Sequence, residues 1–94
     1  MTIDEALDFL EQRKKSMRCS ELERVLADFG FEVSNCKRGG HRKIKHSGIE
    51  GFFGSGFDGA HKADSQIDAC YVREVIKLFK KYREELEDFM EKRQ

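Results

Sequence analysis

The feature that most constrains the fold is a change of hydrophobic period in the middle of the chain. Apolar residues recur at helical spacing on either side of residues 31–46, but within this segment the period falls to two. Gly39 and Gly40 stand between its two halves, and a glycine pair is typical of a two-residue hairpin turn. We therefore predict two antiparallel strands set between helices.

A two-residue turn at Gly39 and Gly40 also predicts which residues face each other across the hairpin. The expected cross-strand pairs are Arg38 with His41, Cys36 with Lys43, and Ser34 with Lys45. Those six residues would share one face of the hairpin. Phe31, Val33 and Ile44 would share the other face, as expected for a strand pair with one side on a core.

Capping signals mark the helices before the hairpin. A helix over residues 2–15 is predicted to begin at a capping box formed by Thr2 and Glu5. A second capping box, Ser20-x-x-Glu23, predicts the start of another helix, which Gly30 would end in a left-handed conformation.

The second half of the chain predicts a weak strand and a long helix. Four glycines between Gly51 and Gly59 weaken a third strand expected over residues 51–57. Asp68 is expected to cap a last helix whose apolar stripe continues almost to the C-terminus. Its final apolar residues, Leu86, Phe89 and Met90, need a partner, either the N-terminal helix or a second copy of the chain.

These elements predict an α+β fold: a three-stranded antiparallel sheet with two helices on one face, in the order α-β-β-β-α. To this core the sequence adds an extra N-terminal helix and an extended C-terminal helix. We predict a helical extension over residues 1–16, a main domain over 17–80, and an extension of the last helix over 81–94.

Composition restricts where such a protein works. The chain of 94 residues is long enough for one domain, and its 18 basic and 18 acidic residues cancel. Three widely spaced cysteines predict reduced thiols rather than a disulfide framework. No apolar run is long enough to cross a membrane, so we expect a cytoplasmic protein.

The hairpin concentrates positive charge that the whole chain lacks. Between Val33 and Ile49 there is no carboxylate, and five cations are present: Lys37, Arg38, Arg42, Lys43 and Lys45. The backbone of Gly39 and Gly40 can approach a phosphate closely, so we predict that these seven residues bind RNA. His41 lies among the cations, whose charge favours a neutral imidazole able to take the proton of an RNA 2′-hydroxyl.

The other two histidines receive different predictions. His46 has the opposite strand parity from His41, which favours a structural role near the edge of the core. His61 follows the glycine-rich segment and is the candidate for a second catalytic acid. The cysteines and histidines lack paired metal-ligand spacing, so we expect neither a metal ion nor a cofactor.

Several short motifs resemble the HicA toxin family over residues 17–79. They are Ser20-Glu21-Leu22 at a helix start, Gly30-Phe31 at its end, and the hairpin Gly39-Gly40-His41-Arg42-Lys43-Ile44-Lys45-His46. The resemblance implies a double-stranded-RNA-binding-like fold, cleavage of mRNA without the ribosome, and inhibition by a HicB antitoxin. It places His41 on the family's catalytic histidine and His46 on the second histidine of its hairpin.

We therefore expect a HicA-like endoribonuclease that is neutralised by a HicB-like antitoxin protein. Gly40 stands where the family usually has Ser, and the third-strand region lacks the family's Pro-His-Pro. A non-catalytic RNA-binding module of the same fold is therefore the first alternative. A dimeric interaction protein, with a homodimer formed through its terminal helices, is the second.

Overall fold

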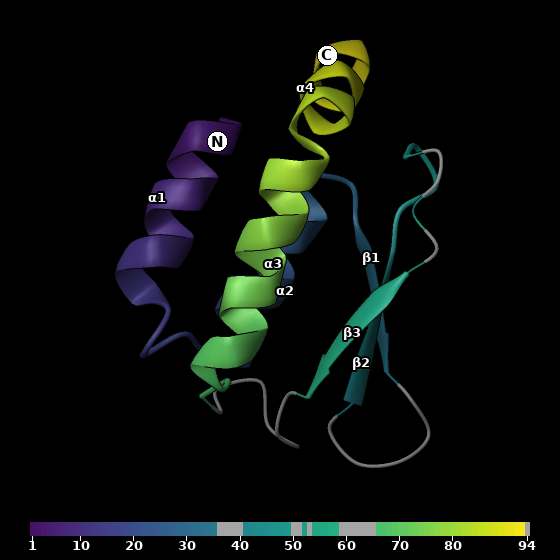
Figure 1. Cartoon of the computed structure of the whole chain (residues 1–94). Helices are drawn as coiled ribbons and strands as arrows, with labels where there is room; N and C mark the ends of the chain where they lie inside the picture. The colour runs from purple at the N-terminus through teal and green to yellow at the C-terminus, as the bar shows by residue number, and fades with distance from the viewer. Residues whose placement is uncertain (36–40, 50–51, 53, 59–65, 94) are drawn as a thin grey trace.

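The computed structural model describes residues 1–35, 41–49, 52, 54–58 and 66–93. Its elements are α1 (Ile3–Arg13), α2 (Cys19–Asp28), β1 (Glu32–Asn35), β2 (His41–Lys45), β3 (Ser55–Asp58), α3 (Ala69–Lys81) and α4 (Arg83–Arg93). The helices lie on one side of an antiparallel sheet with the strand order β1-β2-β3 (Figure 1). No helix of the described residues covers the other face of the sheet.

The helix termini follow their predicted signals in part. The Thr2 hydroxyl accepts a hydrogen bond from the Glu5 N–H at 3.1 Å, and the Glu5 carboxylate accepts one from the Thr2 N–H at 2.8 Å, which confirms the capping box of α1. The same contacts lower the pKa of the Glu5 carboxyl. Gly30 has a φ of 86°, which confirms the left-handed residue predicted after α2.

The capping box predicted at Ser20 is wrong, because the N-cap of α2 is Arg18, two residues earlier, and the helix begins at Cys19. Glu21 accepts a hydrogen bond from the backbone N–H of Arg18 at 3.0 Å, so a carboxylate from the first turn still binds the chain entering the helix. The backbone of Arg18 also bridges to Gln66, which ties the start of α2 to the segment before α3.

The register of the β1–β2 hairpin differs from the prediction by two residues. Ser34 pairs with Lys43 rather than with Lys45, and Val33 pairs with Ile44. A shift of two residues leaves every side chain on its predicted face, because successive residues alternate between faces. The expected faces are therefore right where the structure describes them, while the pairing of Ser34 with Lys45 is wrong.

The chain is α+β as predicted, but the predicted arrangement is wrong, because the described residues form four helices and helix dominates over a small sheet of short strands. The extended C-terminal helix is two helices, since Tyr82 leaves helical geometry with a φ of −106° and α4 begins at Arg83. Figure 1 shows that α4 turns away from the axis of α3. The Tyr82 ring packs edge-on against Phe52, which anchors the chain at this break.

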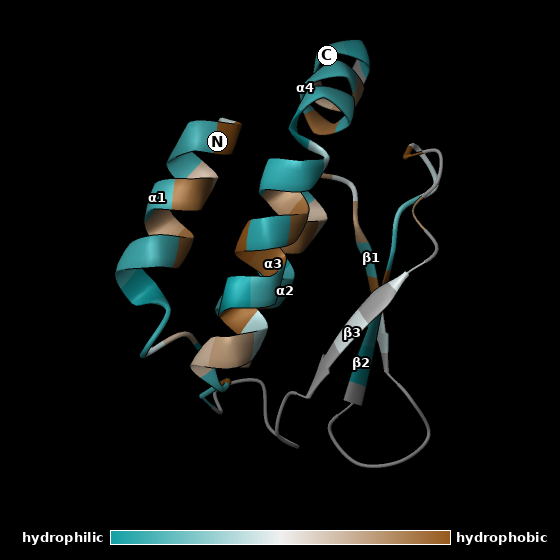
Figure 2. Cartoon of the chain, in the orientation of Figure 1, coloured by the Kyte–Doolittle hydropathy of each residue, from teal (hydrophilic) through white to brown (hydrophobic). Residues whose placement is uncertain are grey.

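The first helix belongs to the core and is not an addition to it. Ile3, Ala6 and Leu10 of α1 are buried in the same apolar cluster as the buried face of α3. Figure 2 shows the apolar side of α1 turned toward α3. A fold class with two helices on the sheet and a separate N-terminal helix therefore does not describe this chain.

The last helix docks through two apolar side chains. Leu86 is fully buried, and Phe89 packs edge-on against His46 with ring centroids 4.7 Å apart. Glycine makes this approach possible, because a Cβ on Gly48 would lie 2.8 Å from the Phe89 ring and one on Gly30 would collide with it. Among the described residues, no helix is long and apolar enough to cross a membrane.

Candidate nucleic-acid interface

The central strand β2 carries the described part of the predicted interface. Lys43 and Lys45 alternate with the buried residues 42 and 44, which places the two lysines on the face of the sheet away from the helices. The side chains of Lys43 and Lys45 are exposed on this outer face, whereas Ile44 is buried against the core. Two lysines two residues apart along a strand therefore point into solvent from the middle of the sheet.

The neighbouring strands shape the surroundings of these lysines. Lys43 lies between Ser34 of β1 and Gly56 of β3, so on one side its cross-strand neighbour has no side chain. Lys45 lies opposite Glu32, an exposed carboxylate just outside the segment that the sequence marks as free of acids. Opposite charges in register attract each other, so we expect Lys43 to be the stronger phosphate ligand of the two.

Arg42 does not share this surface. It lies on the inner face, is only 9% exposed, and its Nε donates a hydrogen bond to the Glu23 carboxylate at 2.9 Å. Glu23 also accepts a hydrogen bond from the thiol of Cys19. The pKa of Cys19 is raised, mainly by burial and secondly by the negative charge of Glu23. Arg42 joins β2 to α2, and we therefore leave it out of the proposed interface.

His46 has the structural role that its strand parity predicts. It is 5% exposed, its Nε2 lies 2.8 Å from the carbonyl oxygen of Phe29, and its Nδ1 accepts a hydrogen bond from the Gly48 N–H at 3.0 Å. A neutral ring with its proton on Nε2 satisfies both contacts. The ring also packs edge-on against Phe31 and Phe89, so it belongs to the core.

Most of the other predicted site residues lie outside the described part of the chain. These are Lys37, Arg38, Gly39, Gly40 and His61, together with Cys36 of the expected hairpin. The backbone of His41 is described as the first residue of β2, and its Cα partner in β3 is Asp58.

Sequence reasoning missed Asp58, because the third strand was expected to end at residue 57. Extending an alternating strand by one residue and pairing it with the hairpin would have found this register position. A carboxylate residue therefore occupies the cross-strand position next to the predicted catalytic histidine.

Comparisons with known proteins add no relative to this description. The chain matches no family model, no curated protein and no solved structure. Within the described residues, no three His, Cys, Asp or Glu side chains gather closely enough to hold a metal ion.

Proposed function

We propose that this chain binds RNA with the outer face of its sheet and cleaves it with His41, as a HicA-like endoribonuclease. The observation that carries the proposal is the exposure of Lys43 and Lys45 on the central strand that begins at His41. A sheet face that carries exposed cations and that no helix of the described residues covers suits the backbone of a single-stranded nucleic acid. The remaining RNA ligands in the proposal are Lys37, Arg38, Gly39 and Gly40.

The proposed reaction uses the 2′-hydroxyl of RNA as its nucleophile. The neutral imidazole of His41 takes the hydroxyl proton, the 2′ oxygen bonds to the adjacent phosphorus, and the bond from phosphorus to the 5′ oxygen breaks. The leaving oxygen receives a proton from the imidazolium or from His61. One product ends in a 2′,3′-cyclic phosphate and the other begins with a 5′-hydroxyl, while Lys43 stabilises the charge on the phosphorane.

The proposed partner is a HicB-like antitoxin that covers the outer face of the sheet, and the proposed compartment is the cytoplasm. A homodimer through the terminal helices has less support, because Leu86 is already buried and Phe89 is already packed on His46 within one chain. The non-catalytic RNA-binding module remains the second candidate, because Gly40 stands where the HicA family usually has Ser.

The test compares wild type with His41→Ala on a long unstructured RNA and on DNA of the same sequence. We expect wild type to cut only the RNA, leaving cyclic-phosphate ends, and the variant to bind RNA without cutting it. Equal cleavage by both proteins removes His41 from the mechanism. Binding without cleavage by either protein selects the non-catalytic module.

A binding experiment tests the surface independently of catalysis. The double variant Lys43→Gln/Lys45→Gln is expected to lower the slope of log affinity against log salt concentration by about one to two. The matched control, Lys77→Gln/Lys80→Gln, removes two exposed lysines from α3 in the helical layer and should leave the slope unchanged. Equal effects of the two variants would show that RNA does not bind this face.

A further inference from the structure

A groove opens in the helical layer, away from the outer face of the sheet. It has a volume of about 480 Å³ and lies between the N-terminal turn of α1, the end of α2 and α4. Its apolar lining comes from Met1, Ile3, Phe29 and Met90. Methionine side chains adapt to differently shaped partners, and the Met1 side chain is exposed here, so the groove suits an apolar anchor.

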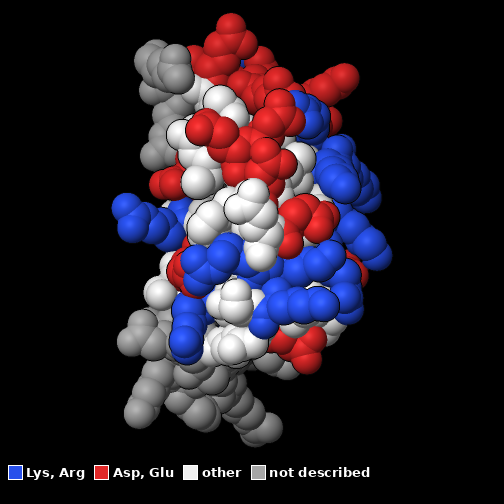
Figure 3. All heavy atoms as spheres, turned by 90° about the vertical axis from the view of Figure 1, so that its left-hand side faces the viewer, with Lys and Arg blue, Asp and Glu red and all other residues white. Residues whose placement is uncertain are grey.

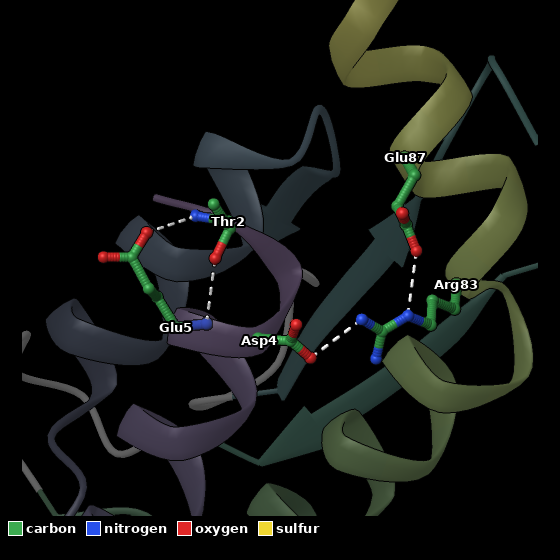
Figure 4. Close-up of polar contacts among 5 residues, drawn as sticks. All are labelled: Thr2, Asp4, Glu5, Arg83 and Glu87. Carbon is green, nitrogen blue, oxygen red and sulfur yellow. Dashed lines mark hydrogen bonds and ion pairs between the residues drawn. The ribbon is translucent and has the colours of Figure 1, made fainter.

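One arginine bridges the two helices, α1 and α4, that line this groove. From the first position of α4, the guanidinium of Arg83 donates a hydrogen bond to Asp4 of α1 and another to Glu87 of α4, both at 2.8 Å (Figure 4). The bond to Asp4 links the two helices across 79 residues of sequence, and the bond to Glu87 lies within α4. They also raise the pKa of Arg83, whose guanidinium is charged at physiological pH with or without them.

The rim of the groove is acidic. Asp4, Glu87 and Glu91 line it, and Arg83 is the only cationic side chain among the described residues that do so. Three carboxylates against one guanidinium leave the side chains of the rim with a net negative charge. On the face that Figure 3 shows, acidic side chains gather at the end of the molecule that carries α4. The exposed acids of that helix are Glu84, Glu85, Glu87, Asp88 and Glu91.

We propose that this groove binds a basic amphipathic segment of a partner protein, with a bulky apolar residue seated between Ile3 and Met90. The apolar floor accepts the anchor, and the acidic rim pairs with lysines or arginines beside it. Nucleic acid does not fit, because its phosphates would meet Glu87 and Glu91. The acidic surface also extends along α4 beyond the groove, which favours a polymeric polycation over a small cationic molecule. This site is separate from the proposed RNA-binding face.

The first test measures binding of a fluorescein-labelled peptide of leucine and lysine, patterned at helical spacing, by fluorescence anisotropy. A peptide with glutamate in place of lysine is the control ligand. Removing the rim charges with Glu87→Gln/Glu91→Gln is expected to weaken binding about tenfold. The matched control, Glu84→Gln/Glu85→Gln, removes the same charge from α4 outside the groove and should change affinity less than about twofold.

Equal weakening by both double variants would overturn the groove, because it would show attraction by the acidic surface in general. No binding of the lysine peptide would overturn it as well. Met90→Gln tests the apolar part of the groove and should weaken binding of the same lysine peptide. Chemical-shift mapping of the lysine peptide on the wild-type protein does not depend on whether a variant folds. The proposal predicts the largest shifts at Ile3, Arg83 and Met90.

A second copy of the chain is the competing occupant, and sedimentation decides between the two. We expect wild type to sediment as a monomer in the absence of peptide. Concentration-dependent self-association that Glu87→Gln/Glu91→Gln abolishes would assign the groove to another copy and overturn the proposal of a different partner.

Discussion

Along β2 and the residue that follows it, side chains alternate between the two faces of the sheet. Lys43 and Lys45 point outward, while Arg42 and His46 point inward. Arg42 donates a hydrogen bond to Glu23 of α2, and the ring of His46 contacts the backbone of Phe29 and Gly48. Among the described residues, every buried side-chain nitrogen or oxygen has a hydrogen-bond partner. Arg42 and His46 therefore join the sheet to the helical layer, and replacing either should lower the free energy of unfolding.

His46 provides the sharpest stability test at this scale. His46→Ala leaves the Phe29 carbonyl and the Gly48 N–H without their ring partner and removes the surface on which Phe89 packs. We expect the free energy of unfolding to fall by about 3 kcal/mol. Urea denaturation measures it, with the exposed neighbour Lys45→Ala as control, which should change stability by less than about 0.5 kcal/mol. Similar losses in both variants would contradict the buried role of His46.

At the scale of the element, α4 depends on glycine as much as on its own apolar residues. Gly30 has a positive φ, and its missing Cβ leaves room for the ring of Phe89. Gly30→Ala therefore lowers stability in two ways: it adds backbone strain of about 1 kcal/mol, and its Cβ displaces the ring of Phe89. Only the second cost depends on α4.

A double-mutant cycle separates these two costs. In wild type we expect Gly30→Ala to lower the free energy of unfolding by about 2–4 kcal/mol, and in a Phe89→Ala background by only about 1 kcal/mol. The coupling of at least about 1 kcal/mol reports the contact between Gly30 and Phe89. Additive effects in thermal or urea unfolding would mean that α4 does not dock on this glycine in solution.

The same elements show what the sequence can and cannot predict. The capping box at Thr2, the left-handed Gly30 and the inward side chain of His46 follow from local rules, and all three are confirmed. The hairpin register cannot be predicted from which residues face the core, because a shift of two residues leaves every side chain on the same face of the sheet. The sequence does not predict the helix break at Tyr82 either. Leu78, Tyr82 and Leu86 keep helical spacing across the break, and no glycine or proline marks it. The register places Asp58 next to His41, so this part of the candidate site also escaped sequence reasoning.

At the scale of the whole molecule, both terminal helices close the fold. Helix α1 places Ile3, Ala6 and Leu10 in the core, and α4 adds a buried Leu86. Arg83 links the two helices through Asp4. The division of the chain into extensions at 1–16 and 81–94 around a main domain then becomes a question of energetics, which truncation can answer.

A chain that ends at Tyr82 loses Leu86 from the core and Phe89 from its place on His46. Deleting one buried leucine costs about 2–5 kcal/mol, and about 1 kcal/mol shifts the melting temperature of a domain this small by about 4–8 °C. We therefore expect the truncated chain to melt more than about 10 °C below wild type in calorimetry, with Leu86→Ala in the full chain showing a large part of the shift. An unchanged melting temperature would make residues 83–94 a dispensable extension. Because RNA is proposed to bind the opposite side of the sheet, truncation should weaken RNA binding only near the melting temperature, and a loss at low temperature would place α4 in the interface.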